Sequence, residues 1–404
     1  MDNLKDFIQQ KVIEDIDLSR EVTDEELLET IDRFVLNISK EEYISMQEKR
    51  RLRKDVFNAI RRLDILQELI EDPSITEIMV NGPSHIFIEK NGTIYPSGKC
   101  FESTQKLEDV VQQIVSHSNR IINEACPIVD SRLSDGSRVN IVLSPIAMEG
   151  PIITIRKFPE TPITIDRLIE LESISTEVAG FLKKLVIAGY NIFISGGTGS
   201  GKTTFLNVLS NYIPSNERII TIEDSAELQI RNIPNLVRLE VRNANSEGSN
   251  EITIRDLIKT SLRMRPDRII VGEVRDAAAI DMLQALNTGH DGSLSTGHAN
   301  SPADMLSRLE SLVLLGAEIP LLAVRKQIAS AIDLIVHLGR LRDRSRRLLE
   351  ITEVLDCRDG EILINPLYRF EETGETDGRI KGKFVMVNEL KNIEKFKRAG
   401  LDIS

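Results

Sequence analysis

A glycine-rich loop between a strand pattern and a helical pattern constrains the fold of this chain more than any other feature. Residues 191–195 form a short, largely apolar run, and apolar residues at helical spacing recur between Thr204 and Tyr212. The segment between them, with the first residue after it, reads Gly196, Gly197, Thr198, Gly199, Ser200, Gly201, Lys202, Thr203 and Thr204. This order predicts a phosphate-binding loop, in which main-chain N–H groups and a helix N-terminus surround phosphate oxygens.

The last residues of this loop pattern indicate which phosphate compound binds there. Lys202 stands where a lysine reaches the β and γ phosphates of a nucleotide, and Thr203 stands where a hydroxyl ligates Mg²⁺. A simple glycine turn between a strand and a helix is the alternative, but the full pattern with both flanks arises rarely by chance. The Asn-Lys-x-Asp signature of guanine recognition does not occur in the chain. We therefore expect ATP and Mg²⁺ as cofactors.

Three further strand patterns end in polar residues that can act on a bound nucleotide. Two apolar runs lead directly into Glu223 and Glu273, and a third strand pattern ends just before His298. Because the carboxyl ends of parallel strands meet at one edge of a sheet, we expect these side chains near the phosphate loop. Glu273 follows its run as a carboxylate near Mg²⁺ usually does, so it joins Thr203 as an expected metal ligand. The set predicts ATP hydrolysis.

The division of labour between the two acids stays open at this point. One carboxylate can order the metal shell while the other orients or deprotonates water, and the sequence does not assign these roles. A helix N-cap is the structural alternative for Glu223 and for Glu273. An ordinary structural histidine is the alternative for His298.

The distribution of Gly, Pro and apolar residues divides the chain into four parts. Residues 1–71 read as a helical N-terminal extension, residues 72–157 as a small α/β domain, and residues 158–170 as a linker containing two prolines. Residues 171–404 alternate short apolar runs with helical patterns, which predicts a parallel sheet with helices on its faces. A strand-containing tail of unassigned role begins at about residue 349. The predicted fold class is therefore α/β.

Two local patterns in the helical extension are informative. The capping-box spacing occurs from Thr23 to Glu26 and from Ser39 to Glu42, and each pattern predicts a helix start. A basic run at 49–54 lies within a helical pattern. We interpret this run as a solvated helix face, and a docking surface for an acidic partner or for lipid head groups is the alternative.

The charge and the cysteine content limit the classes of partner that the chain can bind and the cellular compartment in which it can work. The chain has 404 residues and a formal net charge of -12, which argues against nucleic-acid binding over its whole surface. Cys100, Cys126 and Cys357 lie far apart, which fits a reducing compartment and neither a disulfide framework nor a four-cysteine zinc site. The sequence has neither a secretory signal pattern nor an apolar run of about eighteen residues. We expect a cytoplasmic protein that meets a membrane only through a partner.

Several stretches of the chain resemble one protein family. They are the phosphate loop and residues 75–82, 130–140, 221–228, 262–276 and 288–301. In this order they are similar to the type II/type IV secretion ATPases, and most closely to the CpaF-type ATPase of Tad-pilus assembly. The chain lacks the tetracysteine zinc module of the type II secretion branch. This departure favours the Tad, archaeal-pilus or type IV secretion branches.

The resemblance implies an architecture and a working cycle. It implies an α/β N-terminal domain flexibly joined to a RecA-like P-loop NTPase domain, assembled into a ring hexamer. Hydrolysis of ATP would power pilus assembly or protein secretion through an inner-membrane platform protein, with the motor peripheral at the inner face of the membrane. By motif match, Glu223 belongs to the aspartate box, Glu273 to the Walker B box and His298 to the histidine box.

The resemblance also implies that N-domain arginines lie against the nucleotide phosphates. The candidates in this sequence are Arg132, Arg138 and Arg156. Strand alternation supports them in part, because Val139 and Ile141 share one face of a predicted strand while Arg138 lies on the other. These arginines thus project from the polar face of a small sheet, where plain solvation is the alternative.

The leading hypothesis is a hexameric ATPase motor for a pilus or a secretion system. An ATP-driven DNA-transfer motor is the first alternative, which the net charge of -12 disfavours. Because aromatic and basic residues do not interleave, direct contact with nucleic acid is not expected. A nucleotide-controlled switch with little turnover is the second alternative, and the two carboxylates with His298 argue against it. Which pilin or substrate is moved, and whether a pilus is extended or retracted, stays open.

Overall fold

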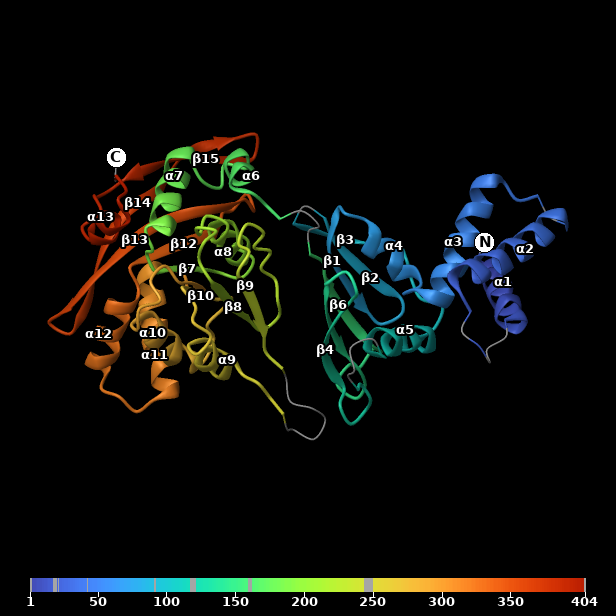
Figure 1. The fold of residues 1–404 in the computed structure, drawn as a ribbon. Helices are drawn as coiled ribbons and strands as arrows, with labels where there is room; N and C mark the ends of the chain where they lie inside the picture. Colours follow the sequence, from blue (N-terminus) through green and yellow to red (C-terminus); the bar gives the residue numbers. More distant parts are fainter. Residues whose placement is uncertain are drawn as a thin grey trace. The chain divides into compact units, whose positions relative to one another are not determined.

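The computed structural model describes residues 2–16, 20, 22–41, 43–90, 92–116, 121–158, 162–242 and 250–402. Two compact units, Met1–Glu160 and Thr161–Ser404, make up the chain (Figure 1). The first contains a six-stranded sheet and the second a nine-stranded sheet, and helices pack on both sheets. The predicted α/β fold class is therefore confirmed.

The N-terminal helices form a bundle with its own core. α1 (Asp2–Asp15), α2 (Asp24–Glu41) and α3 (Met46–Arg61) precede the short α4 (Ile65–Glu71). Apolar residues about one turn apart on each helix meet in one cluster, which contains Ile8, Val12, Leu27, Ile31, Val35, Leu52 and Val56. This shared apolar seam holds α1, α2 and α3 together.

One of the two predicted helix starts is correct. Thr23 and Glu26 exchange side chain–main chain hydrogen bonds at the start of α2, as a capping box does. Ser39 instead lies inside α2, and its hydroxyl donates to a carbonyl oxygen one turn earlier. Glu42 lies outside the described residues. α2 does not end before Ser39, where a new helix was predicted to start, because Ile38 still packs against the bundle core.

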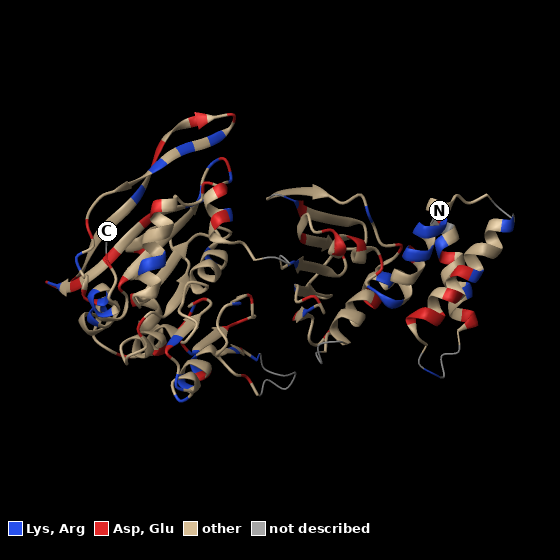
Figure 2. Cartoon of the chain, turned by 45° about the horizontal axis from the view of Figure 1, so that its top comes forward, with Lys and Arg blue, Asp and Glu red and all other residues tan. Residues whose placement is uncertain are grey.

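The basic run at 49–54 lies on α3, and acids of neighbouring helices neutralise part of it. Arg53 lies 2.8 Å from a carboxylate oxygen of Asp32, and Lys54 lies 2.9 Å from one of Glu71. Figure 2 shows basic and acidic residues side by side on these helices. Such exposed pairs contribute little stability, but they support the interpretation of this run as a solvated helix face.

A six-stranded antiparallel sheet follows the bundle in the same unit, in the order β3-β2-β1-β6-β5-β4. Its strands are β1 (Ile75–Asn81), β2 (His85–Lys90), β3 (Thr93–Pro96), β4 (Ile128–Arg132), β5 (Arg138–Val142) and β6 (Ile152–Arg156). α5 (Thr104–Ser116) covers one face, where its Val111 joins Ile141 and Ile153 in a single core cluster. The alternate residues of β5 and β6 lie on the opposite, polar face.

The second unit is built on a nine-stranded sheet, in the order β15-β14-β13-β12-β7-β11-β10-β8-β9. Its strands are β7 (Ile192–Gly196), β8 (Ile219–Glu223), β9 (Leu236–Glu240), β10 (Arg268–Val271), β11 (Leu294–Gly297), β12 (Leu334–Arg340), β13 (Arg346–Arg358), β14 (Glu361–Thr376) and β15 (Arg379–Met386). The strands from β12 to β9 in this order are parallel, as predicted, and β13 to β15 add antiparallel strands. The C-terminal tail is thus part of the central sheet.

Helices cover both faces of this sheet. They are α6 (Ile165–Glu170), α7 (Thr176–Ile187), α8 (Lys202–Ser210), α9 (Ile254–Ser261), α10 (Ala278–Leu286), α11 (Pro302–Gly316), α12 (Leu321–Ala331) and α13 (Glu394–Ala399). Within β7, Ile192 and Ile194 belong to one core cluster and Phe193 belongs to the other. β7 is therefore buried on both faces, as expected of a central parallel strand.

A short helix begins inside the stretch that the sequence predicted as a linker. α6 starts after Thr164, whose side chain caps it, and Leu168 packs into the core of the second unit. Residues 159–161 lie outside the described residues. Within the described ranges, no helix is both long enough and apolar enough to cross a lipid bilayer.

Candidate nucleotide-binding site

The predicted phosphate loop joins the end of β7 to the start of α8. Gly196, Gly199 and Gly201 have φ angles of 155°, 71° and 96°, in the left-handed region that favours glycine. A Cβ atom on Gly196 would also collide with the carbonyl oxygen of Leu338 on the neighbouring strand β12. Residues 197–199 are exposed. The glycines therefore produce a loop whose main chain is open to a ligand.

Lys202, the first residue of α8, folds back over this loop. Its Nζ lies 3.0 Å from the carbonyl oxygen of Gly197 and 3.3 Å from Nδ1 of His298. The side chain is only 7% exposed, although it carries a charge. Thr203 and Thr204 follow in the same turn and are half-buried. The first turn of α8 therefore holds an ammonium group and two hydroxyl groups next to the loop.

Residues at the ends of β10 and β11 continue this arrangement as a chain of charged and polar contacts. Nε2 of His298 lies 3.1 Å from Oε1 of Glu273, whose Oε2 lies 2.9 Å from Arg275. Arg275 in turn lies 3.6 Å from Asp224. The contacts form because β11 pairs with both β7 and β10, so that the residues after these three strands meet at one edge. The structure thus brings Lys202, His298 and Glu273 together, as predicted.

The protonation states of this chain follow from its surroundings. Burial lowers the pKa of His298, and the charge of Lys202 lowers it further, which favours a neutral ring. In that state Nε2–H donates to Glu273 and Nδ1 accepts from Lys202. Burial raises the pKa of Glu273, but the hydrogen bond from Arg275 and the charges of Arg275 and Lys202 act in the opposite direction, and this pKa is lowered. Glu273 is therefore a carboxylate at neutral pH.

Glu223 lies at the same edge in a different environment. The side chain is 3% exposed, and its Oε2 accepts hydrogen bonds of 2.7 and 2.9 Å from the main-chain N–H groups of Glu227 and Leu228. Within the described residues, its buried Oε1 has no hydrogen-bond partner. Burial raises the pKa of Glu223, and the two main-chain bonds only partly oppose this effect. Glycine at 272 leaves the space into which the Glu223 side chain packs.

The three candidate arginines lie side by side on the polar face of the first unit's sheet. Arg132 is the cross-strand partner of Arg138, which is the partner of Arg156 on β6. Glu77 on β1 is the next residue in the row, opposite Arg156. Burial raises the pKa of Glu77, and the charge of Arg156 only partly opposes this effect. Like charges placed directly opposite one another in a sheet repel. The contact of the arginines with a nucleotide stays a prediction.

Two residues at the site were not identified from the sequence. Arg275 stands two positions after Glu273, and this short spacing could have indicated that its guanidinium group contacts Glu273. No sequence pattern could have indicated Arg346, because it begins β13, far along the chain from the phosphate loop. Its Nε nevertheless donates to the carbonyl oxygen of Gly199 over 2.9 Å, and its Cδ lies 3.6 Å from where a Cβ on Gly201 would stand.

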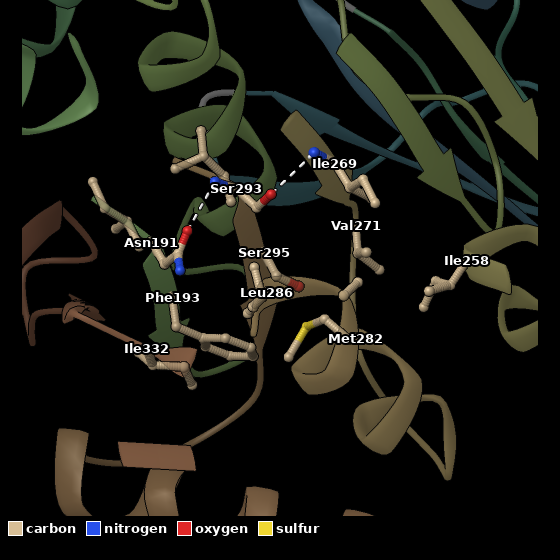
Figure 3. A pocket seen from close by; sticks show the side chains of 13 residues that line it. Asn191, Phe193, Ile258, Ile269, Val271, Met282, Leu286, Ser293, Ser295 and Ile332 are labelled. Atoms are coloured by element: carbon tan, nitrogen blue, oxygen red, sulfur yellow. Dashed lines mark hydrogen bonds between the residues drawn. The ribbon is translucent and has the colours of Figure 1, made fainter. Parts of the chain in front are cut away.

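A separate apolar pocket lies within the core of the second unit (Figure 3). Phe193, Met282 and Ile332 are among its lining residues. The polar groups at its rim already serve the fold, since Asn191 accepts from the main chain at 292–293. None of the residues of the phosphate loop, and none of the acids discussed above, lines this pocket.

Comparison with known proteins identifies the family. Residues 61–392 match the family described as type II/IV secretion system protein. A putative conjugal transfer protein of Mycobacterium tuberculosis is 35% identical over 304 residues, which cover 74% of this chain and 86% of the relative. The type IV secretion system protein VirB11 of Bartonella quintana is 30% identical over 338 residues, covering 73% and 92% of the two chains.

The solved structures bear on the fold. The structure of the pilus retraction motor PilT with bound ADP is 18% identical, has a TM-score of 0.51, and covers 84% of this chain and 87% of that chain. The likeness confirms the expected RecA-like fold. The family match covers the site described above, including the phosphate loop, Glu223, Glu273 and His298. The chain therefore belongs to the type II/IV secretion ATPase family.

Proposed function

We propose that this protein is a Mg²⁺-dependent ATPase that converts ATP and water to ADP and phosphate, and that its turnover drives pilus assembly or protein secretion. The observation that carries the proposal is the contact of Lys202 with His298 and of His298 with Glu273, beside an open glycine loop. An ammonium, an imidazole and a carboxylate at one sheet edge suit phosphoryl transfer to water.

The residues present fit a nucleotide with its metal ion. Main-chain N–H groups of the loop and Lys202 would hold the phosphates, and Thr203 with Glu273 would hold Mg²⁺. Within the described residues, the buried Oγ of Ser200 and Oε1 of Glu223 have no hydrogen-bond partner, and both lie at this edge. ATP would supply the phosphoanhydride bond, and Mg²⁺ would neutralise charge on the phosphates.

The environments of the side chains support distinct tasks during hydrolysis. Glu273 is ionised, so it can accept a proton from water or hold that water in place. His298 keeps one oxygen of Glu273 in position, while Arg275 holds the other. Glu223 anchors the segment at 227–228 and contributes a second, more weakly acidic carboxyl group.

The assembly and the partners are part of the same proposal. We propose a ring of six copies of CpaF type in a Tad pilus system, acting on an inner-membrane platform protein from the cytoplasmic face. The arginine row of Arg132, Arg138 and Arg156, from the same chain or from a neighbour, would complete the site against the phosphates. The clustering of three cations on one sheet face supports this role. Mass measurement with and without nucleotide tests the ring.

A second candidate function is an ATP-driven motor for DNA transfer. The name of the Mycobacterium tuberculosis relative, a putative conjugal transfer protein, favours it. The net charge of -12 argues against direct binding of DNA by this chain. Stimulation of ATP turnover by DNA at moderate salt would support this candidate, and the absence of stimulation would favour a protein cargo.

The enzyme activity is tested with three matched variants. Lys202→Ala should lose nucleotide binding, and Glu273→Gln should bind ATP while its kcat falls by at least about a hundredfold. Glu318→Gln, an exposed acid in the same unit, is the control and should keep wild-type turnover. Wild-type turnover by the Glu273 variant would show the proposed mechanism to be wrong.

A further inference from the structure

The segment at 227–231, called the strap below, follows β8 and packs against α8, the helix that begins at the phosphate loop. The strap belongs to no helix and no strand. Its Leu228 and Ile230 are buried in the same core cluster as Phe205 and Leu209 of α8. Because the strap is outside the sheet ladder, its main-chain groups need hydrogen-bond partners from elsewhere.

Side chains from three elements supply such partners. Glu223 on β8 accepts from the main-chain N–H groups at 227 and 228. Oδ1 of Asn207 on α8 accepts from the N–H of Gln229 over 2.8 Å. Arg238 on β9 donates to the carbonyl oxygen at 228 over 2.8 Å. Asn207 and Glu223 therefore hold neighbouring residues of the strap, one from each side of its turn towards β9.

The position of Asn207 connects the strap to the phosphate loop. Asn207 is buried and lies four residues after Thr203 on α8, which places the two side chains on the same face of the helix, one turn apart. One helical turn thus separates the proposed metal ligand from the residue that holds the strap. On the other side of the strap, both hydrogen bonds of the Glu223 carboxyl group go to strap N–H groups. The orientation of that carboxyl group therefore depends on where the strap lies.

We propose that Asn207 is a positioning residue that holds the strap, and through it the carboxyl group of Glu223, in place for ATP hydrolysis. The proposal rests on the proposed ATPase function, because it concerns the geometry of that site. A shift of reacting groups by about 1 Å can reduce a rate about a hundredfold. Loss of the Asn207 side chain should therefore lower kcat. The affinity for ATP should change little, because the phosphate loop itself is left intact.

Two alanine variants on α8 separate this role from a general loosening of the strap. Asn207→Ala should lower kcat by about threefold to tenfold, with KM for ATP within about twofold. Asn211→Ala is the matched control, because Asn211 lies one turn further along α8 and accepts from the N–H of Arg231 over 3.2 Å. Its kcat should stay within about twofold of wild type, since Arg231 lies beyond the part of the strap that Glu223 holds. An equal fall of kcat in both variants would overturn the proposal.

A double-mutant cycle tests whether Asn207 acts through Glu223. Glu223→Ala should lower kcat at least about tenfold, and Asn207→Ala should lower it no further in that background, because no carboxyl group is left to orient. Losses that multiply in the double variant would show that Asn207 acts through α8 or the phosphate loop, and would overturn the proposal. Wild-type kcat in Glu223→Ala would also overturn it, because the proposal requires Glu223 to take part in turnover.

Hydrogen exchange of the main-chain amides provides a readout that needs no turnover. In the full chain, the amides at 227 and 228 should exchange faster in Asn207→Ala than in wild type and in Asn211→Ala, with the thermal unfolding midpoint measured for each. Unchanged exchange at 227 and 228 in Asn207→Ala would overturn the proposal. A folded wild-type chain without ATP turnover would contradict the proposed function, whatever the exchange at the strap.

Discussion

The ends of β8 and β10 are neighbours in one sheet, yet they hold their glutamates in opposite ways. Glu273 after β10 is part of a chain of charged side chains, in which its two oxygens contact His298 and Arg275. Glu223 at the end of β8 is almost fully buried and, among the described residues, accepts hydrogen bonds only from main-chain N–H groups. The pKa of Glu273 is lowered, whereas the pKa of Glu223 is raised.

Equivalent positions at a sheet edge therefore need not have equivalent chemical states. Two acids whose environments move their pKa values apart can be assigned different roles, since one stays ionised while the other more readily holds a proton. We propose that Glu273 acts on water and metal and that Glu223 supports the loop after β8. Four experiments test this contrast between Glu273 and Glu223 and the loop beside them.

The largest expected effect is the difference in turnover between two glutamine variants. Glu273→Gln should lower kcat at least about a hundredfold, and Glu223→Gln should lower it by about tenfold, with ATP binding retained in both. The reason is that Gln removes the ionised group at 273, whereas at 223 its amide oxygen can still accept the hydrogen bonds from the main-chain N–H groups of Glu227 and Leu228. Steady-state kinetics provide the measurement. Equal losses of kcat in the two variants would remove the contrast.

Arg275 should control the acidic limb of the pH–rate profile. Its hydrogen bond and charge lower the pKa of Glu273, so Arg275→Ala should shift that limb to higher pH. Loss of one charge-assisted hydrogen bond corresponds to about a tenfold fall in kcat at the acidic end. Arg275→Lys should restore much of the activity. An unchanged pH profile in Arg275→Ala would show that Glu273 is not the titrating group.

The contributions of Glu273 and Glu223 to the free energy of unfolding should change with pH in opposite directions. The pKa of Glu273 lies below its ordinary 4.5, so its contribution to the free energy of unfolding is present above pH 4.5 and is lost as pH falls. The pKa of Glu223 lies above 4.5, so its contribution is present below pH 4.5 and is lost as pH rises. Denaturant unfolding of wild type and each glutamine variant across pH tests both signs. The same slope for the two variants, relative to wild type, would contradict them.

The smallest expected effect lies outside the pair of acids, at Arg346. Its hydrogen bond to Gly199 is exposed, so Arg346→Ala should raise KM for ATP by only about twofold to tenfold. Arg358→Ala, at the far end of the same strand, is the matched control. A change in kcat with no change in KM would place Arg346 in the chemistry and not in binding.

Local patterns account for what the sequence predicted well. The phosphate loop was predictable because strand, loop and helix are adjacent in the chain and glycine is required at positive φ. Glu273 and His298 were predictable because the ends of parallel strands share an edge, which needs no knowledge of distant packing. The same rule placed Glu223 at this edge but said nothing of its burial, since that depends on the absence of a side chain at Gly272.

Features that depend on tertiary packing were missed. The predicted helix start at Ser39 was wrong because Ile38 continues the apolar face of α2, and the actual capping box lies at Ser45 and Glu48. The last part of the predicted linker, residues 165–170, is the helix α6, whose Leu168 packs into the core of the second unit. The contact of Arg346 with the phosphate loop depends on the order of the strands in the sheet, and no local sequence pattern predicts that order.

That strand order has a practical consequence for anyone shortening this protein. β12 lies against β7 so closely that Leu338 fixes the residue type at Gly196, and β13 delivers Arg346 to the tip of the phosphate loop. β12 and β13 therefore line the proposed nucleotide site from the side, although the motifs identified in the sequence all end before them. A chain cut after α12 would keep every motif and lose one wall of the site.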